Sequence, residues 1–64
     1  MIYPNVKVRL TGFDGNAFNI LSRCQREMRR KKIPQTKIDS FLKEAQSGNY
    51  DHLLQTCMKW LNVS

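Results

Sequence analysis

Residues 35–60 read QTKIDSFLKEAQSGNYDHLLQTCMKW and carry two apolar stripes at helical spacing, separated by Ser47-Gly48-Asn49. In this turn, Gly48 can take the left-handed conformation that closes a helix, and Asn49 can cap the next one. The apolar positions recur every three or four residues, as they do on one face of a helix. The first stripe contains Ile38, Phe41, Leu42 and Ala45, and the second contains Tyr50, Leu53, Leu54, Cys57, Met58 and Leu61, with Trp60 at its edge. The pattern predicts helices over about residues 35–46 and 50–60.

Another amphipathic helix is predicted upstream, over about residues 15–31. Its apolar residues lie within about 100° of one another on a helical wheel. These residues are Ala17, Ile20, Leu21, Cys24 and Met28. Pro34 ends the helix, because the residue before a proline is disfavoured in the helical conformation.

Residues 12–16 read GFDGN, which is typical of a turn before a helix. Asp14 is the predicted N-cap, with Phe13 and Phe18 as a hydrophobic staple, and Asn16 is the alternative cap. The two glycines resemble a phosphate-binding loop. However, the lysine and Ser/Thr of a P-loop and the third glycine of a dinucleotide site are missing, and Asp14 would repel an anion. A structural turn is therefore favoured.

Residues 6–11 read VKVRLT, and their alternation of apolar and polar residues predicts one half-buried strand. Pro4 marks its beginning and Gly12 its end. A lone strand leaves its backbone groups unpaired. Either the C-terminal tail, residues 61–64, pairs with it, or a second copy of the chain pairs with it in a homodimer through Val6–Thr11. The expected fold is α+β and mainly helical: one N-terminal strand followed by three amphipathic helices, in a single compact domain over residues 1–64.

The positive charge is unevenly distributed along the chain. Residues 1–37 hold nine Lys and Arg against Asp14 and Glu27, a net charge of +7, while residues 38–64 have a net charge of −1. This asymmetry suggests one binding surface. No apolar run approaches the roughly 20 residues that span a bilayer, and no signal peptide is apparent, so we expect a cytoplasmic protein and no membrane partner.

Residues 23–32 read RCQREMRRKK, and six of the ten are cationic. On a helix, the four arginines share the side opposite the apolar stripe, where several cations can neutralise phosphates. The predicted site contains Arg23, Arg26, Arg29, Arg30, Lys31 and Lys32, and Arg9 extends it if the polar side of the strand faces the same way. The leading functional hypothesis is a small non-enzymatic basic module that binds nucleic acid or another polyanion through this face. The alternatives are a protein-interaction or homodimerisation module that docks an acidic partner, and a merely solvated face, since cations in the last turn favour the helix dipole.

Catalysis, metal binding and cofactor binding find little support in the sequence. Cys24 and Cys57 lie on apolar stripes, whereas a nucleophilic cysteine needs a partly exposed, electropositive site. Asp51 and His52 are adjacent on a helix and do not face each other. A disulfide between the two cysteines is arithmetically allowed, but two free buried thiols are favoured in a reducing compartment. We expect no enzyme activity, no metal and no cofactor.

Tyr3 and Phe13 are candidate stacking platforms for bases, although a role in covering the core is favoured.

Three segments carry a resemblance to a known family. They are GFDGNAF over residues 12–18, IDxFLxEA over residues 38–45, and SGNYDHLL over residues 47–54. Together they resemble a family of small uncharacterised bacterial and phage proteins, over nearly all of residues 6–63. The resemblance implies a compact standalone domain and assigns no activity and no site residue.

Overall fold

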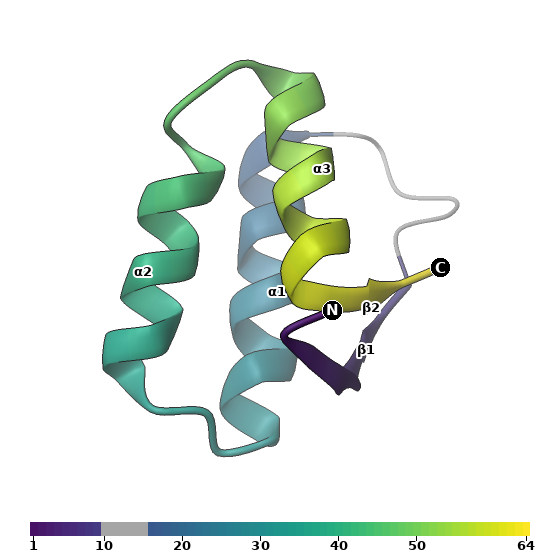
Figure 1. Ribbon diagram of the computed structural model, residues 1–64, viewed down its shortest axis with the longest axis vertical. Helices are drawn as coiled ribbons and strands as arrows, with labels where there is room; N and C mark the ends of the chain where they lie inside the picture. The colour runs from purple at the N-terminus through teal and green to yellow at the C-terminus, as the bar shows by residue number, and fades with distance from the viewer. Residues whose placement is uncertain (10–15) are drawn as a thin grey trace.

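The computed structural model describes residues 1–9 and 16–64. Their elements follow the order β1 (Tyr3–Val8), α1 (Ala17–Arg30), α2 (Gln35–Ala45), α3 (Tyr50–Trp60) and β2 (Leu61–Val63). Figure 1 shows α2 and α3 side by side with α1 behind them, and the two strands on the side of α3 away from α2. The α+β, mainly helical class is confirmed, and the three helices lie within one or two residues of their predicted ranges.

The apolar stripes of the three helices meet in one core. Its fully buried side chains come from every helix and both strands: Val6, Val8, Ile20, Cys24, Met28, Ile38, Phe41, Cys57 and Leu61. Trp60 closes this core from the end of α3, with its ring 5.7 Å from that of Phe41 and 6.2 Å from that of Tyr3. Two members of the apolar stripe predicted over residues 50–61, Tyr50 and Met58, remain exposed.

The C-terminal tail pairs with the N-terminal strand inside the same chain. β2 runs parallel to β1, with Tyr3 opposite Leu61 and Val8 opposite Val63. The Ser64 N–H donates to the Val8 carbonyl at 3.0 Å. Of the two predicted partners for the strand, the structure therefore shows the C-terminal tail. Within the described residues β1 is paired, so the unpaired strand that suggested a homodimer through Val6–Thr11 is not found.

The strand boundaries were predicted wrongly. β1 begins at Tyr3, so Pro4 lies within it and does not precede it. The register is irregular between Tyr3 and Lys7. A proline lacks the N–H of a regular ladder and is tolerated at such irregularities. The predicted end of the strand, residues 10–11, lies outside the described residues, as do Gly12, Phe13, Asp14 and Gly15 of the predicted turn.

α1 starts later than predicted. Asn16, the alternative cap, is the N-cap residue, and its side-chain oxygen accepts a hydrogen bond from the Phe18 N–H at 2.8 Å. The prediction of Asp14 as the cap is therefore wrong, because the first helical residue is Ala17. Phe18 leaves 77% of its surface exposed, so it is not packed as a staple would be.

α1 ends in a turn that normally favours glycine. Lys32 has φ of 59°, and its N–H donates to the Arg29 carbonyl at 2.9 Å. The Ile33 N–H reaches back to the Met28 carbonyl at 3.1 Å. These two bonds define a Schellman motif, and the partly buried Ile33 and the buried Met28 both pack in the core, the apolar contact that commonly accompanies it.

The turn between α2 and α3 is fixed by polar contacts around His52. The His52 ring nitrogen Nε2 lies 2.8 Å from the Glu44 carbonyl oxygen, which also accepts a hydrogen bond from the Ser47 hydroxyl at 2.7 Å. The Asn49 side chain caps α3, as predicted, by accepting from the His52 N–H at 2.9 Å. Gly48 was predicted to be left-handed, and the structure shows that it is not. Glycine is needed here for another reason, because a Cβ at this position would lie 2.8 Å from the His52 ring.

Candidate nucleic-acid interface

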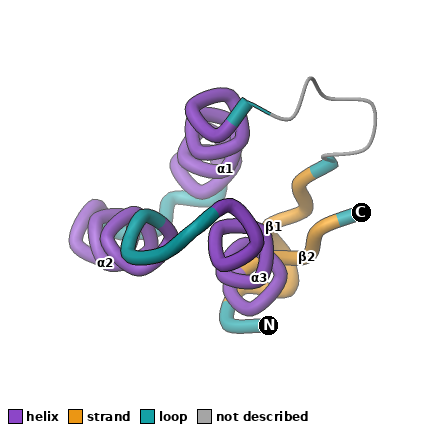
Figure 2. The backbone as a smooth tube through the Cα atoms, turned by 90° about the horizontal axis from the view of Figure 1, so that it is seen from above, coloured by secondary structure: helices purple, strands orange, loops and turns teal. Residues whose placement is uncertain are grey.

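The side of α1 that faces away from the core carries the predicted basic residues. Ile20, Leu21, Cys24 and Met28 bury the inner side of the helix. Viewed from above, α2 and α3 both lie on that inner side, and α1 projects from the bundle (Figure 2). We define the outward face of α1 as Arg23, Arg26, Arg29, Arg30, Lys31 and Lys32, which are all exposed except the partly buried Arg23.

Most of this positive charge is not neutralised by neighbouring carboxylates. Arg30 lies 3.5 Å from Glu27, the one acidic residue of α1. Arg29 donates to the Gln25 side-chain oxygen at 3.3 Å, which leaves its charge uncompensated. Arg26, Lys31 and Lys32 make no side-chain hydrogen bond or ion pair with any residue of 1–9 or 16–64. The outward face therefore concentrates positive charge in a solvent-accessible position.

Two shallow hollows lie between these side chains. One, of about 520 Å³, is lined by Ser22, Gln25, Arg26, Arg29 and Arg30. The other, of about 130 Å³, is lined by Asn19, Ser22, Arg23 and Arg26. Ser22 and Arg26 belong to both. The short Ser22 side chain leaves room between longer guanidinium groups, which are suited to holding phosphate oxygens in bidentate contacts.

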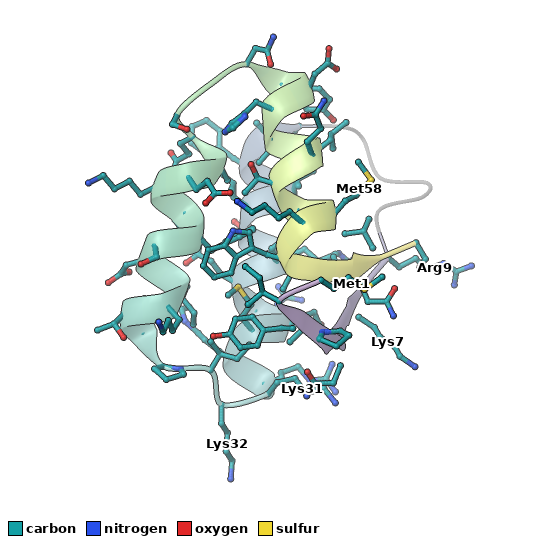
Figure 3. The ribbon with its side chains drawn as sticks, in the orientation of Figure 1. Met1, Lys7, Arg9, Lys31, Lys32 and Met58 are labelled. Atoms are coloured by element: carbon teal, nitrogen blue, oxygen red, sulfur yellow. The ribbon has the colours of Figure 1, made fainter. Side chains whose placement is uncertain are left out.

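Arg9 lies apart from the end of α1. It follows β1, whose Val6 and Val8 point into the core, so that Lys7 and Arg9 are exposed. Figure 3 shows Arg9 extending outward on the side of the sheet, whereas Lys32 extends downward from the end of α1. The two side chains point in different directions, so Arg9 does not continue the row of cations on the helix.

An apolar hollow at the other end of α1 was missed by sequence reasoning. It encloses about 280 Å³ where the first turn of α1 meets the turn between α2 and α3, and Phe18 and Tyr50 are among its lining residues. The sequence signal was present. On a helical wheel, Phe18 lies about 60° outside the apolar stripe of its helix. The pattern had assigned Phe18 to a staple and Tyr50 to the core, yet Tyr50 is 43% exposed.

The two cysteines meet in the core without a disulfide. Their Sγ atoms are 3.7 Å apart, and both side chains are fully buried. The contact with the Cys57 thiol, together with burial, raises the pKa of Cys24 well above its usual range. A protonated, inaccessible thiol is a poor nucleophile, so this pair joins α1 to α3 as part of the core.

The remaining candidate groups do not converge into a site. Within residues 1–9 and 16–64, no three His, Cys, Asp or Glu side chains are close enough to hold a metal ion. Tyr3 packs its ring beside Trp60 and is partly buried, which fits the predicted covering role. None of the three described helices has both the length and the apolar sequence that crossing a bilayer requires.

Comparison with known proteins gives no assignment: no family model, no curated protein and no solved structure matches this chain. The resemblance to small uncharacterised bacterial and phage proteins therefore stays a prediction.

Proposed function

We propose that the protein is a small, non-enzymatic module of the cytoplasm that binds nucleic acid through the outward face of α1. The observation that carries this proposal is Arg26. It lies in mid-helix, opposite the core, exposed and without a partner among the described residues. Arg29 and Arg30 lie in the last turn, where the helix dipole favours cations. That explanation does not extend to Arg26. Two free cysteines in contact fit a reducing compartment.

The charge is also maintained at some cost to stability. Arg26 is three residues from both Arg23 and Arg29 and four from Arg30, and each like-charge pair costs a helix a few tenths of a kcal/mol. Lys32 occupies a left-handed position, which costs a residue other than glycine about 1–2 kcal/mol. Neither feature improves folding, and both add positive charge to the outward face of α1. A phosphate backbone is the most general ligand for such a surface.

The test is the binding of short oligonucleotides at several salt concentrations. The logarithm of the affinity should fall linearly with the logarithm of salt concentration, with a slope of about −0.7 to −0.9 per neutralised phosphate. The double variant Arg26→Glu with Arg30→Glu should weaken binding to all sequences and flatten the slope. The matched control is Lys37→Glu with Lys43→Glu, which makes the same charge change at exposed positions of α2. If both double variants lose affinity for the oligonucleotides equally, the effect is one of net charge in general, and the proposal is rejected.

An acidic protein is the competing partner for the same face. Capture of a protein that survives nuclease treatment and is lost in the α1 double variant would favour that alternative. Loss of all captured material on nuclease treatment favours nucleic acid.

A further inference from the structure

The apolar hollow at the start of α1 has aromatic walls and a polar rim. Phe18 and Tyr50 are exposed by 77% and 43%, and both line the hollow. Leu21 and Leu53, which also line it, are buried. Gln46 and Asn49 contribute amide groups. Exposed aromatic rings beside an apolar surface indicate a place where a flat, apolar ligand can be covered.

The rim keeps both a hydrogen-bond donor and an acceptor for a ligand. Gln46 uses its amide nitrogen to donate to the Leu42 carbonyl at 3.1 Å, and this bond leaves its oxygen free to accept. Asn49 uses its side-chain oxygen as the cap of α3, and this bond leaves its amide nitrogen free to donate. A nucleobase has flat apolar faces and an edge with both donors and acceptors, so it matches the walls and the rim together.

Residues at the start of α1 line the hollow, and the outward face lies farther along the same helix. Phe18 is followed on the same helix by Asn19, Ser22 and Arg26, which line the next hollow along. At 1.5 Å per residue, Phe18 and Arg26 are about 12 Å apart along the helix axis. A strand with one base in the apolar hollow therefore has its neighbouring phosphates within the positive field of the arginines.

We propose that this hollow takes one unpaired nucleobase, and that the ligand of the protein is single-stranded nucleic acid. The inference rests on the proposed function and narrows it. A duplex keeps its bases stacked inside and cannot place a ring in the hollow that Phe18 and Tyr50 line. Proteins that bind single strands combine a positive surface with aromatic side chains on which bases stack, which is the combination found along α1.

The experiment measures the affinity of labelled oligo-dT, oligo-U, a mixed-sequence duplex and inorganic polyphosphate by fluorescence anisotropy. Phe18→Ala and Tyr50→Ala each remove one aromatic wall. Met58→Ala is the control, because Met58 is an exposed apolar residue of α3 outside the hollow. The fluorescence of the buried Trp60 confirms that each variant is folded.

Phe18→Ala should weaken binding to the single strands by about 5- to 150-fold, since stacking on one aromatic residue is worth about 1–3 kcal/mol per base. The salt dependence of the affinity should be the same in Phe18→Ala as in the unmodified protein, because no phosphate contact is lost. Binding to the duplex and to polyphosphate should change little, and Met58→Ala should behave as the unmodified protein. An effect on either oligo-dT or oligo-U supports the inference.

Two results separate the inference from the proposed function. Salt-dependent binding that is as tight for the duplex as for the single strands, or that is unaffected by Phe18→Ala and Tyr50→Ala, overturns the base-binding hollow and leaves the basic face intact. Absence of salt-dependent binding to any of the four probes rejects the proposed function itself.

Discussion

We predict that Lys32 lowers the free energy of unfolding of the protein while it adds positive charge to the outward face of α1. It takes a left-handed conformation at the end of α1, with φ of 59°, inside the two hydrogen bonds of the Schellman motif. Glycine is the residue most often found at this position. We therefore expect Lys32→Gly to be more stable than Lys32→Ala, although both variants lose the same charge. The comparison isolates the backbone conformation from the electrostatics.

The magnitude follows from two opposing contributions. Removing the side chain relieves about 1–2 kcal/mol of left-handed strain. The greater freedom of glycine in the unfolded chain offsets about 0.5–1 kcal/mol of that gain. Lys32→Gly should therefore exceed Lys32→Ala by about 1 kcal/mol, which corresponds to about 4–8 °C in Tm for a domain of this size. Both variants should also lose affinity for nucleic acid to the same extent, with the salt slope reduced by about 0.7 if Lys32 contacts one phosphate of a single strand.

Urea denaturation followed by Trp60 fluorescence measures the stability difference. Trp60 is the single tryptophan of the chain and lies between Tyr3 and Phe41, so unfolding exposes it. If Lys32→Gly is no more stable than Lys32→Ala, the left-handed turn is absent in solution and Lys32 carries no backbone strain. If the two variants bind oligonucleotides as tightly as the unmodified protein, Lys32 takes no part in binding.

Three further predictions concern the fold. Gly48→Ala should destabilise by about 1–3 kcal/mol by urea denaturation, because its Cβ would lie 2.8 Å from the His52 ring and 2.9 Å from the His52 Cβ, and the loss should shrink in a His52→Gly background, which removes both groups; an equal loss in both would contradict this contact. The Lys59 ammonium, 3.1 Å away, lowers the pKa of the Glu44 carboxyl below its ordinary value of 4.5, so its stabilising contribution is present above that pH and lost as pH falls through the lowered pKa. Glu44→Gln should therefore make acid unfolding less steep, and an unchanged acid limb would argue against the ion pair. Removal of residues 62–64 should cost about 1–3 kcal/mol through the lost pairing with β1, and unchanged urea stability would refute the parallel register.

The helices were predictable because their signals are local. Ile38 and Phe41 repeat at helical spacing, and Asn49 caps the helix that follows it. Such patterns need no knowledge of the rest of the chain. Pro34 before α2 and the apolar stripe of α1 were local signals of the same kind.

The strand and the turns depended on partners far away in the sequence. β1 is bounded by its pairing with β2, and the Asn62 amide reaches the Pro4 carbonyl across 58 positions. No local pattern reveals that register. The left-handed Lys32 was equally hidden, because sequence rules look for glycine there. Gly48 was identified as a turn residue for the wrong reason, since its contact with His52 arises only in the folded turn.

The candidate site was predictable in part. The cations of α1 were evident from the sequence, and the structure places their side of the helix away from the core. The place of Phe18 in the apolar hollow was missed because an apolar residue near the start of a helix is usually interpreted as part of a hydrophobic staple. Only the folded chain shows that it lies beside Tyr50 over a shared hollow.

Binding of a single strand along α1 is tested most directly by an amide chemical-shift titration of the labelled protein with a short single strand at low and high salt. We expect shifts along α1 from Phe18 to Lys32 and at Tyr50, with α2 little affected between Lys37 and Lys43, and smaller shifts at high salt. Shifts concentrated on α2, or none along α1 at low salt, would contradict this expectation.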